Sequence, residues 1–182
     1  MTPEPGTENV EKLATFTLDE AARSELVRTA SELTFVFHNA AGWPTAVVMS
    51  FLEHEGTFYV TATSQRAHVR SLAADPRVSI VISNAGTELL GRQMLSLRCL
   101  AFVHTDRETI EWFLPLFTRK LGGKSEAFAA LLDSENRVVV ELRPVGVTAS
   151  HDSRRMPGDG RGDPDSGPRR NVRAASPPSA QR

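Results

Sequence analysis

The stretch that decides the fold reads Thr61-Ala62-Thr63-Ser64-Gln65-Arg66-Ala67-His68-Val69-Arg70. It passes from the end of a strand through a hydroxyl-rich turn into a helix, for which Ser64 is the expected N-cap. Free backbone N–H groups at a helix start attract anions. Arg66 and Arg70 stand four residues apart, a like-charge pair that costs about 0.2–0.5 kcal/mol unless an anion lies between them. The pattern indicates an anion site, and two solvated arginines, or arginines paired with a carboxylate such as Asp75, are the alternative.

Strand and helix patterns extend on both sides of this stretch. Apolar and polar residues alternate over 57–63, and the turn Glu53-His54-Glu55-Gly56 joins that strand to a long one over 43–52. Further strands are expected over 34–38, 78–83, 95–104 and 137–147, and helices over 18–33, 64–75, 105–121 and 127–132. Six strands with helices inserted irregularly favour a mainly β (α+β) antiparallel barrel over a doubly wound sheet.

Composition divides the chain of 182 residues into a body and two flanking segments. We expect a flexible N-terminus over 1–16, one domain over 17–150 and a disordered tail over 151–182. The tail contains Pro, Gly and Arg but no Leu, Ile, Phe, Tyr or Trp, so it has little apolar surface to bury. Its net charge is +3 and that of the body is −4. An acidic body argues against a nucleic-acid partner.

Other functional classes lack their signatures. The sequence has no GxGxxG loop, P-loop, GxSxG elbow or HExxH motif. Cys99 is the only cysteine, so we expect a buried thiol and neither a disulfide nor a multi-cysteine metal site. With no apolar run of membrane-spanning length and no signal peptide, the protein is expected to be cytoplasmic and without a membrane partner.

The segment from Gly56 to Ser79, with its ending Asp75-Pro76-Arg77-Val78-Ser79, resembles the split β-barrel family of pyridoxamine 5′-phosphate oxidase. Gly42-Trp43-Pro44 and the strand over 138–147 extend the resemblance over about residues 20–148. It implies a six-stranded antiparallel split β-barrel with peripheral helices, and a homodimer with cofactor sites at the subunit boundary. The presence of an arginine at position 66 resembles the deazaflavin-dependent branch of the family more than the vitamin-processing oxidase.

The resemblance also implies a cofactor and the residues that hold it. FMN is the first candidate, a deazaflavin coenzyme the alternative and haem the third. The implied cofactor-binding residues are Thr61, Thr63, Ser64, Arg66, His68, Arg70 and Gln93. Relatives commonly have lysine where this chain has His68. Because histidine is only partly charged at neutral pH, we expect phosphate binding to strengthen as the pH falls from about 8 toward 6.

These expectations support two functions. The first is a flavin- or deazaflavin-dependent oxidoreductase that acts on a small organic substrate by hydride transfer. The second is a non-catalytic module that binds flavin or haem on the same fold, which the histidine at position 68 favours. In neither case do we assign a catalytic residue or a metal ligand, since the hydride chemistry belongs to the cofactor.

Overall fold

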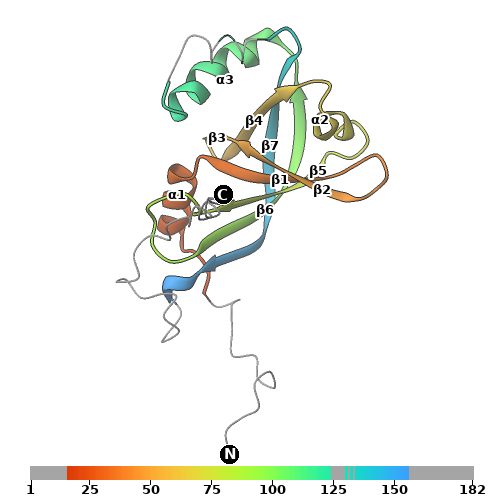
Figure 1. Ribbon diagram of the computed structural model, residues 1–182. Coiled ribbons are helices and arrows are strands. Elements are labelled where there is room, and N and C mark those ends of the chain that lie inside the picture. Colours follow the sequence, from red (N-terminus) through yellow and green to blue (C-terminus); the bar gives the residue numbers. More distant parts are fainter. Residues whose placement is uncertain (1–15, 124–129, 131, 133, 156–182) are drawn as a thin grey trace, which may run out of the picture.

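The computed structural model describes residues 16–123, 130, 132 and 134–155. Their strands form one antiparallel sheet in the order β2-β1-β5-β6-β7-β4-β3 (Figure 1). The strands are β1 (Glu32–His38), β2 (Pro44–Ser50), β3 (Leu52–His54), β4 (Thr57–Thr63), β5 (Arg77–Ser83), β6 (Gln93–His104) and β7 (Arg137–Asp152). The helices among these residues include α1 (Glu20–Thr29), α2 (Ala67–Ser71) and α3 (Arg107–Lys120).

Phe51 is the point at which the sheet curls into a barrel. The strands β2 and β3 lie at opposite edges of the sheet, yet only Phe51 separates them in the sequence. The ladder between β2 and β1 ends at the pair Ser50 and Glu32, and the next ladder, between β3 and β4, begins at Leu52 and Tyr59. Phe51 is fully buried. The sheet can bring its two edges this close only by bending strongly, so it forms an open barrel.

Local sequence explains most of the boundaries. Glu55 and Gly56 both have positive φ, 52° and 79°, which closes the tight β3–β4 hairpin that the sequence predicts. The Asp19 side chain accepts a hydrogen bond from the N–H of Ala22 at the start of α1. Asp106 does the same for Thr109 at the start of α3. These caps satisfy donors that the first turn of a helix leaves free.

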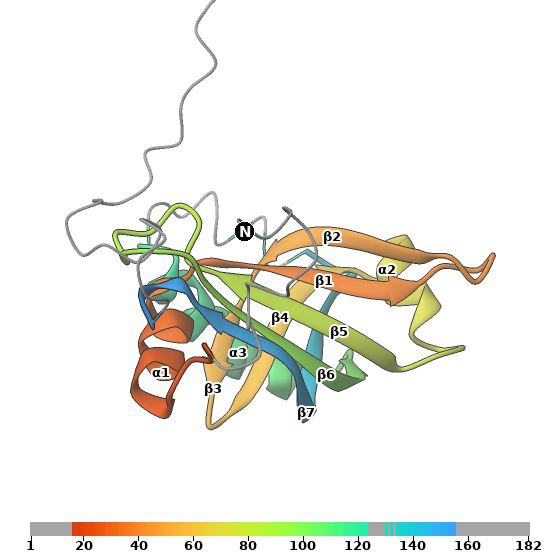
Figure 2. The same cartoon turned by 90° about the horizontal axis from the view of Figure 1, so that it is seen from below.

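The apolar side chains form two buried clusters on opposite faces of the sheet. The larger cluster fills the barrel and includes Leu26 of α1, Phe35 of β1 and Ile80 of β5. The smaller one packs α3 against the other face of β4 and β7, through Phe113 and Val139 among others. Figure 1 shows α1 and α3 at different ends of the sheet, and Figure 2 shows α1 beside β3 and the C-terminal part of β7.

The mainly β barrel class is confirmed, with two differences. The sheet has seven strands, not six, because the long strand expected over 43–52 is divided at Phe51. The last strand continues past residue 150 to Asp152, where His151 and Asp152 are buried. The helix expected over 127–132 lies almost entirely outside the described residues, as does the tail from residue 156. In the described residues no helix is long and apolar enough to cross a membrane.

Candidate functional site

The turn that follows β4 leads into a helix of only one and a half turns. The N–H of Arg66 donates to the carbonyl of Thr63 at 3.0 Å, so the chain turns once before α2 begins at Ala67. The N-cap is therefore Arg66, in an extended conformation without a side-chain cap, and the expected cap at Ser64 is wrong. The N–H of Ser64 instead donates to the carbonyl of Asn136, at 2.9 Å. This bond ties the turn to the start of β7.

The start of β7 adds a second arginine to this turn. Thr63 and Arg137 are paired in the β4–β7 ladder. Burial lowers the pKa of Arg137, and the nearby charge of Arg66 lowers it further. The two guanidinium groups are therefore close enough to repel each other across the turn. An anion between them would turn this repulsion into attraction.

Four residues with hydroxyl groups lie in β4, in the turn after it and in the turn before β7. Thr61 donates its hydroxyl to the carbonyl of Val138 at 2.8 Å, so it braces the ladder and has only acceptor capacity left. Thr63 and Ser64 are half-buried. Ser134 lies in the turn before β7, where its carbonyl accepts the N–H of Arg137. Its buried hydroxyl oxygen has no hydrogen-bond partner in the described part of the chain.

His68 does not join this polar group as a cation. Its ring packs edge-on against Phe35 and Phe37, with centroid distances of 6.1 and 6.0 Å, and its Nε2 is buried without a partner in the described residues. Burial lowers the pKa of His68, and Arg66 lowers it further. The imidazole is therefore neutral at pH 7. This geometry gives no support to a phosphate interaction that strengthens as the pH falls toward 6.

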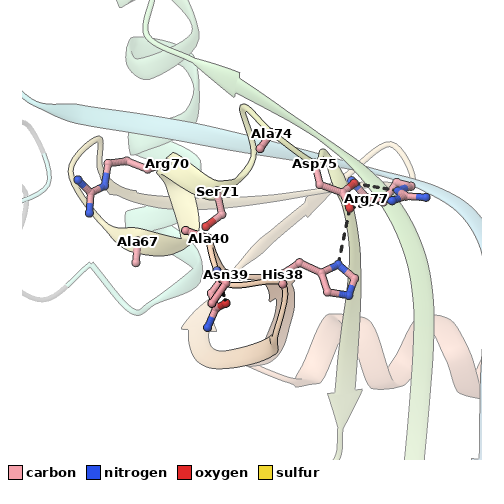
Figure 3. A pocket seen from close by; sticks show the side chains of 11 residues that line it. His38, Asn39, Ala40, Ala67, Arg70, Ser71, Ala74, Asp75 and Arg77 are labelled. Atoms are coloured by element: carbon pink, nitrogen blue, oxygen red, sulfur yellow. Dashed lines mark hydrogen bonds and ion pairs between the residues drawn. The ribbon is translucent and has the colours of Figure 1, made fainter.

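Arg70 lines a cavity that Arg66 does not line. A groove of about 1020 Å³ lies between α2 and the β1–β2 turn, and Arg70 and Ala67 line it whereas Arg66 does not. Figure 3 shows Asp75 between His38 and Arg77, with Arg70 directed away from them. Asp75 binds Arg77 at 2.8 Å and lies 3.6 Å from His38. The structure therefore does not bring Arg66 and Arg70 together in one pocket.

Gln93 lies at the far end of the sheet from α2. It is fully buried at the start of β6, where its N–H donates to Asn84 Oδ1 and its Nε2 donates to the carbonyl of Leu90. Its Oε1 is buried and has no hydrogen-bond partner in the described residues. Its assignment as a cofactor-binding residue stays a prediction.

The order of the strands, the turn after β4 and the paired arginines can now be compared with known proteins. The family model described as pyridoxamine 5′-phosphate oxidase matches residues 18–151. The chain belongs to the pyridoxamine 5′-phosphate oxidase family. No curated protein matches the sequence.

Solved structures share the fold of this family member at low sequence identity. The conserved hypothetical protein Rv2991 from Mycobacterium tuberculosis is 17% identical, with a TM-score of 0.66 over 76% of this chain and 88% of that one. HutZ, a haem storage protein from Vibrio cholerae, is 20% identical, with a TM-score of 0.60 over 72% and 94%. An F420 reductase is 22% identical, with a TM-score of 0.55 over 69% and 94%.

Sequence reasoning identified the turn of this family member but missed two residues beside it. Arg137 and Ser134 lie about 70 residues beyond Arg66 in the sequence, and only the β4–β7 ladder brings them to it. Spacing along the chain carries no signal for such a contact. A correct pairing of Thr63 with Arg137, had it been inferred from the two strand patterns, would have placed both arginines at one site.

Proposed function

We propose that this chain binds a phosphate-bearing flavin or deazaflavin, with FMN as the first candidate, and uses it to oxidise or reduce a small organic substrate. The proposal rests on family membership and above all on the β4–β7 ladder, which pairs Thr63 with Arg137 and so brings Arg137 to the turn that carries Arg66. In the family the bound ring system supplies hydride transfer, while the protein contributes binding and orientation. Arg66, Arg137 and the hydroxyls of Thr63 and Ser64 are the groups that would hold the phosphate.

The donors at this turn fit a phosphate group well. Guanidinium groups bind phosphate through paired, charge-assisted hydrogen bonds, and hydroxyl groups add neutral ones. The unpartnered Ser134 hydroxyl supplies a further donor. His68 has a different role in this proposal. Its neutral ring packs against Phe35 and Phe37 of β1 and so holds α2 against that strand.

A non-catalytic module that binds flavin or haem is the second candidate. The observation in its favour is the lowered pKa of His68, because a neutral ring where relatives carry lysine leaves one cation fewer for the phosphate. Turnover separates the two candidates. The second candidate predicts that the protein binds FMN or a deazaflavin without turnover. Nicotinamide coenzymes then do not reduce the bound cofactor, and small organic acceptors do not oxidise its reduced form.

The phosphate site is tested by titrating FMN and a deazaflavin coenzyme into the full chain and following the fluorescence of each. Arg66→Ala and Arg137→Gln should each weaken binding about tenfold to hundredfold, the effect of losing one charge-assisted hydrogen bond. Arg119→Ala is the matched control, because Arg119 is an exposed arginine of α3 away from the turn. If both site variants bind the coenzymes as tightly as this control, the phosphate does not lie between Arg66 and Arg137.

We also propose that the chain forms a homodimer through its outer sheet face, defined here by Val36, Pro44, Val48, Leu100, Phe102 and Val145. These residues come from β1, β2, β6 and β7. The exposed fractions of Val48, Phe102 and Val145 are 65%, 40% and 56%. A hollow of about 620 Å³ lies in this face. Exposed apolar side chains that gather on one face of a sheet, here on β2, β1, β6 and β7, are typical of a protein interface. A second copy of the chain presents the same surface.

A further inference from the structure

A second cavity opens where the barrel is split. The strand β7 pairs with β4 only as far as Leu142, opposite Phe58, and then continues along β6 alone. The helix α1 and the β3–β4 turn both lie beside the place where β7 leaves β4 (Figure 2). The cavity between them has a volume of about 390 Å³, which is within the range of small-molecule sites.

The wall of this cavity is apolar. It is formed by Val27, Phe58, Leu95, Leu97, Pro144 and Val147. Four of these side chains are buried, while Val147 is 44% exposed at the mouth. A hydrocarbon chain that leaves water for such a wall gains binding free energy in proportion to the apolar surface that it buries.

Two arginines of α1 line the same cavity. Arg23 and Arg28 are both exposed, and neither guanidinium lies within 4 Å of a carboxylate among the described residues. The carboxylate on the wall, Glu53, accepts the N–H of Gly56 at 2.7 Å and so holds the β3–β4 turn. The cavity therefore combines an apolar interior with two arginines that form no ion pair and one carboxylate held at the β3–β4 turn, so its lining carries one net positive charge.

We propose that this cavity binds a small molecule with an apolar body and one anionic head group, with the head group at Arg23 and Arg28. The apolar wall and the net positive charge of the lining select this class, because an anionic head group can bind an arginine that forms no ion pair and a neutral molecule cannot. A carboxylate is the simplest head group of this kind, since guanidinium binds it through two parallel hydrogen bonds.

This site is separate from the turn at Arg66. Gly56 and Phe58 are at the start of β4, and the turn begins at its end, after Thr63. At about 3.3 Å per residue, the strand separates the two by roughly 17–20 Å. The test of binding at the cavity therefore does not require the proposed cofactor.

Matched probes test the proposal. Octanoate and 1-octanol have the same hydrocarbon chain and differ in the charge of the head group. Titration of the full chain, followed by amide shifts in NMR spectra, should give a dissociation constant for octanoate of about 1 mM or lower, with shifts at Gly56, Leu95 and Leu97. Octanol should bind at least about tenfold more weakly.

Variants separate the head-group site from the wall. The double variant Arg23→Gln, Arg28→Gln should lose the tenfold preference for octanoate, whereas Arg119→Gln should keep it. Val147→Trp should weaken both probes, because the larger side chain occupies the mouth of the cavity without disturbing the core. Equal binding of octanoate by the double variant and the parent overturns the proposal, and so do shifts confined to the outer sheet face around Leu100 and Val145.

Discussion

The imidazole Nε2 of His104 lies 2.7 Å from Oε2 of Glu141, and this contact ties the end of β6 to β7. Arg143 binds the same carboxylate, with its Nε 2.6 Å from Oε1. Asp106, the N-cap of α3, lies 3.7 Å from the other nitrogen of His104. Only 7% of Glu141 is exposed. This carboxylate thus joins two strands near the point where α3 begins.

Glu141→Gln should destabilise the fold and reduce its sensitivity to acid. Burial raises the pKa of Glu141, but hydrogen bonds from Arg143 and His104 outweigh it and hold the pKa below its ordinary value of 4.5. The stability that results is complete above the unfolded pKa and is lost as the pH falls through the folded pKa. At pH 7 the variant should lose about 1–3 kcal/mol of unfolding free energy, measured by urea denaturation.

The difference in unfolding free energy between the parent and Glu141→Gln should then decrease as the pH is lowered from 6 to about 3.5. Glu32→Gln serves as the control, since Glu32 is an exposed carboxylate of β1 without a partner in the described residues. If this difference in unfolding free energy stays constant over the range, the charge of Glu141 does not contribute to stability.

His68→Leu should stabilise the fold, and more so at lower pH. The change removes a buried Nε2 without a hydrogen-bond partner and keeps an apolar contact with Phe35 and Phe37. Because the folded pKa of His68 is lowered, the parent has its full stability above the unfolded value of 6.5 and loses it as the pH falls below that value. The melting temperatures of the two proteins should therefore diverge between pH 7 and pH 5. Convergence over that range would mean that the ring is charged in the folded protein.

Leu100→Glu should convert the proposed dimer to a monomer without unfolding it. Leu100 is 37% exposed on the outer sheet face, so a carboxylate at this position is solvated in the monomer but buried in an interface. Light scattering measures the mass, and circular dichroism checks the fold. Thr29→Glu, on the exposed surface of α1, is the control. A parent chain that is already monomeric at micromolar concentration contradicts the interface.

Cys99 should resist thiol reagents in the folded protein. It is 1% exposed on β6, and burial raises the pKa of its thiol to about 12. The thiolate, which is the reactive form, is then scarce at pH 8. Ellman's reagent should label the thiol within minutes in 6 M guanidinium but far more slowly in buffer. Equally rapid labelling in both would show that β5 and β7 open readily around it.

Local patterns were sufficient to predict most of the elements. Alternation identified β4, and the turn residues Glu55 and Gly56 marked the hairpin. Each of these signals depends on neighbours a few residues apart. Phe51 carries no such signal, because an apolar residue in an apolar run does not reveal that its neighbours pair with different strands.

The candidate site was predictable only in part, for the same reason. The hydroxyl-rich turn and Arg66 follow from local sequence, whereas Arg137 reaches them through a ladder between strands far apart in the chain. The orientation of His68 depends on Phe35 and Phe37 in β1. The burial of the His68 ring is a property of the assembled barrel. The charge of the ring therefore could not be inferred from its position in the sequence.

The C-terminal boundary of the domain gives the last prediction. Removal of residues 156–182 should leave stability almost unchanged, because that segment contains no Leu, Ile, Phe, Tyr or Trp. Truncation after Ser150 should be costly. It removes Ser153, whose hydroxyl accepts the N–H of Arg92, and Asp152, whose N–H donates to the carbonyl of Phe16. It also removes the ion pair between Asp152 and Arg154, at 2.7 Å.

Melting temperature distinguishes the two truncations. The longer fragment, ending at Arg155, should melt within about 3 °C of the full chain, and the shorter one should melt more than about 5 °C lower, which corresponds to a loss of over about 1 kcal/mol. Asp152→Asn in the full chain is the matched control, because it weakens the pair with Arg154 but keeps the backbone of β7. Its effect should lie between those of the two fragments. If both fragments melt together, the last residues of β7 are not part of the cooperative unit, and the domain ends at residue 150.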